Sequence, residues 1–139
     1  MATNYFGTLE TARAFVPVLE RNGGGAIVNV LSMLSLASLA GMSGCSASKA
    51  AAHSITQALR PGLARRGISV HGVYPAGIDT DMLAGVDTSK APPREVANGI
   101  LDALELDQED IFPDPASQQM SQTWWTDPKS FERMFASMG

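Results

Sequence analysis

The chain has 139 residues, of which 45% are hydrophobic and 17% charged, and its formal net charge is −4 at pH 7. This composition is typical of one folded domain, and the lack of a basic stripe argues against nucleic acid as a partner. A single cysteine excludes an internal disulfide and a cysteine-built zinc site, so no metal is expected. No apolar run reaches the roughly 20 residues of a membrane span. We therefore expect a cytoplasmic protein that does not bind membranes.

The apolar pattern predicts helices and strands that alternate along the chain. Helical periodicity covers residues 4–20, 46–64 and 94–105. Runs rich in branched residues predict strands at 26–31, 68–74 and 110–112. Proline inside a helix removes a hydrogen bond, so Pro61 is expected to kink or end the second helix. In the tail, Asp127 and Pro128 are typical of an N-cap and a first helical position, which predicts a last helix.

This order of elements favours a parallel sheet of right-handed β-α-β units within a single domain over residues 1–139. Loops are expected at 32–44, where the residues are small, and at 75–92. The acidic residues around the third strand have no His or Cys partner at metal-binding spacing. We therefore expect a solvated turn at the acids Glu105, Asp107, Glu109, Asp110 and Asp114.

Four short motifs stand at fixed places relative to these elements. Asn4-Tyr5-Phe6-Gly7 opens the first helix, and Ser32 follows the first strand. Cys45 and Lys49 lie at the start of the second helix, and Cys45 comes 13 residues after Ser32. Pro75-Ala76-Gly77-Ile78-Asp79-Thr80 follows the second strand. In this order and spacing the motifs resemble those of the short-chain dehydrogenase/reductase family, whose active-site helix carries Tyr-x-x-x-Lys.

The resemblance is most specific over residues 4–82, and it implies an α/β fold with a partial Rossmann-like parallel sheet of about three strands, flanking helices and a helical tail. Family members use NAD or NADP to oxidise or reduce alcohols and carbonyls, so a small-molecule substrate is implied. In the family, the tyrosine exchanges the proton, the lysine lowers its pKa and holds the nicotinamide ribose, the serine contacts the substrate oxygen, and the asparagine anchors a water. The residues implied to be catalytic are Asn4, Ser32, Cys45 and Lys49. Those implied to contact the cofactor are Lys49, Ile78 and Thr80.

Two departures from the family pattern limit the expected activity. Cys45 stands where the family has its tyrosine, and a thiol ends several ångströms short of a phenol oxygen. The sequence also has no G-x-G-x-x-G turn for phosphates, and no strand precedes the helix that starts at residue 4. The resemblance therefore implies an N-terminally truncated member that consists of the C-terminal half. We expect this chain alone to bind no cofactor and to lack dehydrogenase activity.

The missing half would leave the strand at 26–31 as an exposed edge, so we expect a homo-oligomer or a complementing chain as the partner. Two other functions stay open. One is a non-catalytic, oligomeric binding module. The other is a repurposed enzyme that uses Cys45 and Lys49 without a nicotinamide, because a helix N-terminus and a nearby lysine both lower the pKa of a thiol.

Overall fold

A single parallel β-sheet forms the centre of the molecule in the computed structural model, which describes residues 2–78, 84–85 and 90–138. Its strands lie side by side in chain order: β1 (Gly25–Val30), β2 (Ile68–Val73) and β3 (Asp110–Ile111). β1 pairs with β2 along its whole length, whereas β3 joins only at Gly72 and Val73. The predicted α/β fold with three parallel strands is thereby confirmed, and each strand lies within one or two residues of its predicted range.

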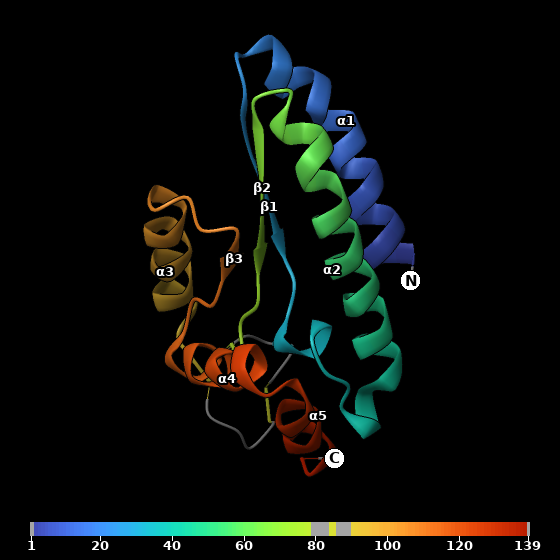
Figure 1. Ribbon diagram of the computed structural model, residues 1–139, viewed down its shortest axis with the longest axis vertical. Coiled ribbons are helices and arrows are strands. Elements are labelled where there is room, and N and C mark those ends of the chain that lie inside the picture. Colours follow the sequence, from blue (N-terminus) through green and yellow to red (C-terminus); the bar gives the residue numbers. More distant parts are fainter. Residues whose placement is uncertain (1, 79–83, 86–89, 139) are drawn as a thin grey trace.

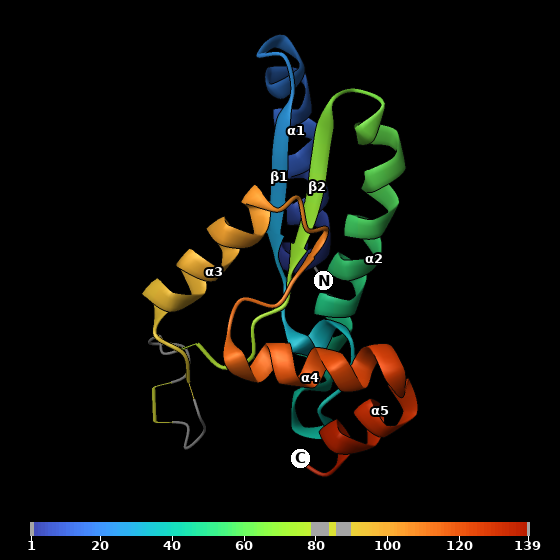
Figure 2. The same cartoon turned by 60° about the vertical axis from the view of Figure 1, so that its left-hand side comes forward.

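Helices cover both faces of this sheet. α1 (Thr8–Arg21) and α2 (Ser43–Ala64) lie together on one face, and α3 (Pro93–Glu105) lies on the other (Figure 1). α4 (Pro115–Thr126) and α5 (Pro128–Ala136) lie at the carboxyl end of the strands (Figure 2). The predicted helical tail is therefore present, and Asp127 caps α5 by accepting a hydrogen bond from the backbone N–H of Ser130.

Three apolar clusters hold these layers together. Between the sheet and the α1–α2 layer, the buried side chains are Val16, Leu63, Ile68 and Val70. Between the sheet and α3 they are Val73, Ala103 and Ile111. At the carboxyl end of the strands, the tail packs onto the sheet through Leu31, Met33, Ala52, Tyr74, Phe131 and Phe135. The tail is thus part of the core at the end of the sheet where ligands bind in open α/β folds.

Pro61 was predicted to kink or end the second helix, and the second of these alternatives is wrong. α2 begins at Ser43 and continues past Pro61 to Ala64, and Pro17 likewise lies inside α1. Both prolines are exposed, so the backbone groups that lose a helical hydrogen bond lie on the solvent side of each helix. The predicted 32–44 loop contains two short 3₁₀ turns, Met33–Ser35 and Ala40–Met42, and a π-helical segment, η1 (Ala2–Gly7), precedes α1.

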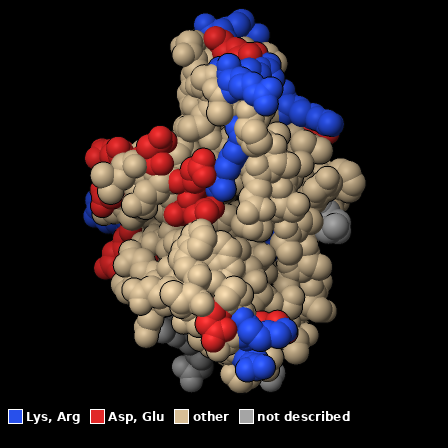
Figure 3. Space-filling model, in the orientation of Figure 1, with Lys and Arg blue, Asp and Glu red and all other residues tan. Residues whose placement is uncertain are grey.

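Among the strands of the described residues, β1 lies at an edge and has one unpaired side, because the sheet order is β1-β2-β3. Val30, at its end, is 56% exposed. On the face in Figure 3, acidic side chains gather beside α3 and β3, and basic ones gather at the end of the molecule where α1 and α2 finish. Within the described residues, no helix has the length and apolarity needed to cross a membrane.

Candidate functional site

Ser32 lies just beyond the carboxyl end of β1, where it caps the turn Met33–Ser35. Its hydroxyl accepts a hydrogen bond from the Leu34 N–H at 3.1 Å, and its own N–H donates to the Ser35 hydroxyl at 3.2 Å. This reciprocal capping fixes the Ser32 side chain, which is half-buried. In the part of the chain that the structure describes, no acceptor takes the Ser32 hydroxyl proton, which leaves this proton available for a ligand oxygen.

Lys49 reaches the same end of β1 from the neighbouring helix. It lies in the second turn of α2, and its Nζ donates to the carbonyl oxygen of Val30 at 3.5 Å. Val30 is the last residue of β1 and comes two residues before Ser32. The structure therefore brings the predicted lysine and serine to one strand end, although a contact of 3.5 Å is a weak hydrogen bond.

Ser48, in the first half of α2, connects Asn4 to Cys45 through two hydrogen bonds. The Asn4 side-chain amide donates to the Ser48 hydroxyl at 2.8 Å, and that hydroxyl donates to the Cys45 carbonyl oxygen at 2.8 Å. Asn4 lies in η1, so this contact ties the π-helical segment to α2. Cys45 is half-buried and lies one helical turn from Lys49, on the same side of the helix. The four residues predicted to be catalytic thus form two pairs that α2 connects: Ser32 and Lys49 at the end of β1, and Asn4 and Cys45 on either side of Ser48.

The turn after β2 lies beside the Ser32 segment. The carbonyl oxygen of Pro75 accepts a hydrogen bond from the Met33 N–H at 3.1 Å. Further along, the Gly77 carbonyl oxygen accepts from the Ala91 N–H at 2.8 Å, and Ile78 forms an isolated parallel bridge with Ala91. This turn therefore places Ile78, predicted to contact the cofactor, near the same end of the sheet. Thr80, the other predicted contact, lies outside the described residues.

A polar network that the sequence analysis did not foresee joins α2 to the sheet. The hydroxyl of Tyr74, a fully buried residue, donates to Asp110 at 3.3 Å and forms a 2.7 Å hydrogen bond with Nδ1 of His53. Arg60 donates to Asp110 at 2.8 Å and to the carbonyl oxygen of Val70 at 3.1 Å. Burial lowers the pKa of His53, and burial together with the Asp110 charge raises the pKa of Tyr74 well above its ordinary value.

The expected solvated turn of acids is wrong for two of its members. Asp110 is ion-paired with Arg60, and its side chain is only 19% exposed. Asp114 is 1% exposed, and its carboxylate accepts from the Ser117 N–H at 2.9 Å and from the Ala76 N–H at 3.0 Å. Glu109 is exposed, as expected. The signal that could have revealed Asp114 is the sequence Asp-Pro-x-Ser, which also stands at the start of α5.

Residues at the other end of the sheet do not form a phosphate site. Gly24 has a φ of +115°, and a Cβ there would lie 2.5 Å from the carbonyl oxygen of Gly67. Gly24 is thus needed because two backbone segments pass close together. The glycine run leads into β1 and not from a strand into a helix, so it lacks the geometry of a dinucleotide cradle. Among the described residues, no cluster of three or more His, Cys, Asp or Glu side chains could hold a metal ion.

Comparison with known proteins agrees with this geometry. The family model for the short chain dehydrogenases matches residues 1–91. An uncharacterized oxidoreductase of Staphylococcus aureus (strain USA300) is 35% identical over 104 residues, which are 73% of this chain and 45% of that protein. One from Staphylococcus epidermidis is 36% identical over 101 residues, 73% of this chain and 44% of its own length.

Solved structures give the same result over more of the chain. A short-chain dehydrogenase from Burkholderia cenocepacia J2315 in complex with NADP has a TM-score of 0.89 and 39% identity, covering 96% of this chain and 56% of its own. One from Sphingobium yanoikuyae in complex with NADPH has a TM-score of 0.72 and 27% identity, covering 89% of this chain and 54% of its own. The chain spans about half the length of the curated relatives that it matches. These matches show that the chain belongs to the short-chain dehydrogenase/reductase family.

Proposed function

We propose that this chain is the substrate-side half of an NAD(P)-dependent oxidoreductase that acts on a carbonyl or alcohol, and that it works only together with a dinucleotide-binding half. The observation that carries the proposal is the gathering of Ser32, Lys49 and the Pro75–Ile78 turn at the carboxyl ends of β1 and β2. Ligands of open α/β sheets bind at this end. Support also comes from the Burkholderia cenocepacia relative, whose structure holds NADP.

The residues present fit only one end of such a cofactor. Lys49 and Ile78, both near the carboxyl end of the sheet, are the residues proposed to contact the nicotinamide and its ribose, and a bound nicotinamide would supply or accept a hydride. By contrast, Gly24 is packed against Gly67, so the glycine run of the described residues offers no cradle for the pyrophosphate. The chain alone is therefore proposed to hold no dinucleotide and to show no turnover.

The protein's own residues would orient and protonate the substrate. The Ser32 hydroxyl, whose proton is uncommitted, would donate to the substrate oxygen, and the positive charge of Lys49 would stabilise negative charge that develops nearby. Asn4 would hold the first turn of α2 in place through Ser48. Cys45 supplies a shorter proton donor than a phenol, so proton transfer is the weak step of this arrangement.

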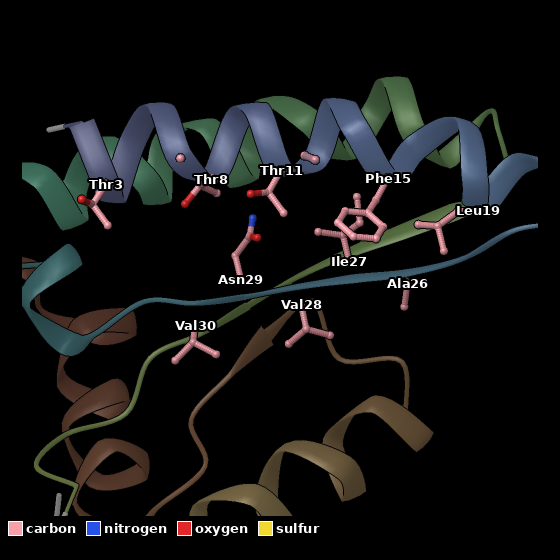
Figure 4. Close-up of a pocket in the computed structure, with 12 residues that line it drawn as sticks. Thr3, Thr8, Thr11, Phe15, Leu19, Ala26, Ile27, Val28, Asn29 and Val30 are labelled. Carbon is pink, nitrogen blue, oxygen red and sulfur yellow. The ribbon is translucent and has the colours of Figure 1, made fainter.

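The free side of β1 is the surface proposed to receive the dinucleotide-binding half. A groove of about 580 Å³ runs between α1 and β1. In Figure 4, Ile27 and Asn29 point from β1 toward α1, while Val28 and Val30 point to the opposite face. Phe15, which lines the groove, is 57% exposed. An edge with apolar residues on both faces suits another strand with helices packed against it.

Calorimetry tests the proposal directly. The chain alone, titrated with NADP and with NAD, is expected to give no binding heat. We define the fused protein as this chain joined to the part of the Burkholderia cenocepacia relative that it leaves unmatched. The fused protein is expected to bind NADP saturably, and Lys49→Met is expected to weaken that binding, whereas the exposed Lys129→Met is not. Saturable binding by the chain alone, or none by the fused protein, would contradict the proposal.

Without its other half, the chain is proposed to self-associate through the β1 edge. Light scattering at micromolar concentration is expected to show a dimer or a larger species. Val30→Lys, which puts a charge on the exposed edge, is expected to weaken association by about tenfold or more. Leu106→Lys is the matched control, because Leu106 is 72% exposed and follows the C-terminal end of α3, outside the β1 strand. A monomeric wild-type chain, or equal effects of both lysines, would exclude the edge as the interface.

A further inference from the structure

Asp114 joins two segments that are far apart in the sequence. One carboxylate oxygen, Oδ1, accepts from the Ser117 N–H at 2.9 Å and so caps α4. The other, Oδ2, accepts from the Ala76 N–H at 3.0 Å. The side chain is 1% exposed, and the hydroxyl of Ser117 completes the cap by accepting from the Asp114 N–H. Each carboxylate oxygen therefore has a separate task, one in the tail and one in the turn after β2.

The Pro75–Ile78 turn is tied at three consecutive residues to three different segments. The Pro75 carbonyl oxygen accepts from Met33, in the turn that Ser32 caps. Ala76 donates to Asp114, and the Gly77 carbonyl oxygen accepts from Ala91, just before α3. Two of these ties join backbone to backbone, whereas the tie at Ala76 uses a side chain. Only this tie is open to removal by a single conservative substitution.

From this arrangement we infer that Asp114 is a positioning residue, which fixes the Pro75–Ile78 turn against the helical tail and thereby sets the nicotinamide side of the site. This inference rests on the proposed function, because the turn matters for the cofactor only if the completed protein binds one. A hydrogen bond that a carboxylate accepts from a backbone N–H is among the stronger kinds. The tail, which packs into the core beside Tyr74, thus serves as the rigid support of the turn.

Asp114→Asn separates the two tasks of the carboxylate. Asparagine keeps one acceptor oxygen and replaces the other with an NH₂ group, which cannot accept from an N–H. The asparagine is therefore expected to keep the α4 cap, because Asn and Asp are about equally good N-cap residues. The Ala76 N–H is expected to lose its acceptor. Asp127→Asn is the matched control, because Asp127 caps α5 with the same Asp-Pro-x-Ser sequence and accepts from the Ser130 N–H at 3.0 Å. Asp127 is exposed and belongs to another helix start.

Amide hydrogen exchange of the chain itself, read at the Ala76 N–H, tests the tie. Asp114→Asn is expected to speed this exchange by about tenfold or more relative to the Leu31 N–H, which donates to Val73 within the sheet. Asp127→Asn is expected to leave the ratio unchanged. Equal acceleration of exchange at Ala76 and Leu31 would mean that Asp114 only stabilises the fold. An unchanged exchange rate at Ala76 would mean that the hydrogen bond to Asp114 does not protect this N–H. Either result overturns the inference.

The fused protein supplies the second readout. Asp114→Asn is expected to raise its dissociation constant for NADP by about tenfold, with Asp127→Asn within twofold of the unaltered protein. Faster exchange at Ala76 with unchanged NADP affinity would overturn the positioning role while leaving the tie intact. If the unaltered fused protein bound no NADP, the proposed function would fail and the cofactor part of this inference with it. The exchange ratio would still decide whether Asp114 fixes the turn.

Discussion

Cys45→Tyr is expected to raise kcat/KM of the fused protein for a carbonyl substrate by about a hundredfold or more. Cys45 lies half-buried in the first turn of α2, one turn before Lys49, so a phenol placed there would extend beside the lysine. A correctly positioned proton donor contributes about 10²- to 10⁴-fold, and a misplacement of about 1 Å already costs about a hundredfold. The gain is measured as NADPH consumption at saturating cofactor.

Cys45→Phe provides the control for this experiment, because it adds the same ring without the hydroxyl. It is expected to give no gain, so a gain with tyrosine alone identifies the proton donor. If activity were lost in both variants while the unaltered fused protein was active, the thiol would be the reactive group. That outcome would favour the enzyme that uses Cys45 and Lys49 in another chemistry. The unfused chain is expected to remain inactive in every variant.

Local patterns were sufficient to predict the layers of this fold. The branched runs at 26–31 and 68–74 predicted β1 and β2 within one residue at each end, because branched residues favour strands. β2 is largely buried, whereas β1 is half-buried or exposed. The family resemblance implied that Ser32 and Lys49 belong to one site, and the structure brings both to the carboxyl end of β1. The exposed edge at β1 follows from the same topology.

Features that depend on long-range packing could not be predicted in this way. Tyr74 lies outside the four sequence motifs, and its ring folds back over Gly72, where a Cβ would lie 2.5 Å from the hydroxyl. No sequence rule specifies that this hydroxyl meets His53 and Asp110, because the contacts depend on how α2 packs on the sheet. The start of α4, by contrast, could have been predicted from the sequence. Asp114 begins the same Asp-Pro-x-Ser sequence as Asp127, which was recognised as an N-cap.

Arg60→Met is expected to lower the free energy of unfolding by about 3 kcal/mol, measured by urea denaturation of the chain. The Arg60 and Asp110 side chains are only 15% and 19% exposed, and removal of the guanidinium leaves a partly buried carboxylate without its partner. The carbonyl oxygens of Val70 and Glu109 lose a donor in the same step. Arg13→Met, at a surface pair with Glu10 that is more than 60% exposed, is expected to cost about 0.5 kcal/mol or less.

A second substitution distinguishes two effects of Arg60→Met, the unpaired charge left on Asp110 and the lost packing of the Arg60 side chain. Asp110→Asn keeps an oxygen that accepts from the Tyr74 hydroxyl but removes the carboxylate charge. In the Arg60→Met background it is therefore expected to restore about 1 kcal/mol or more, whereas in the unaltered chain it is expected to destabilise. Additive losses in the double variant would show that the ion pair itself contributes nothing. Because α2 carries Lys49 and Cys45 in its first turns and Arg60 near its end, this pair also anchors the helix that presents the site.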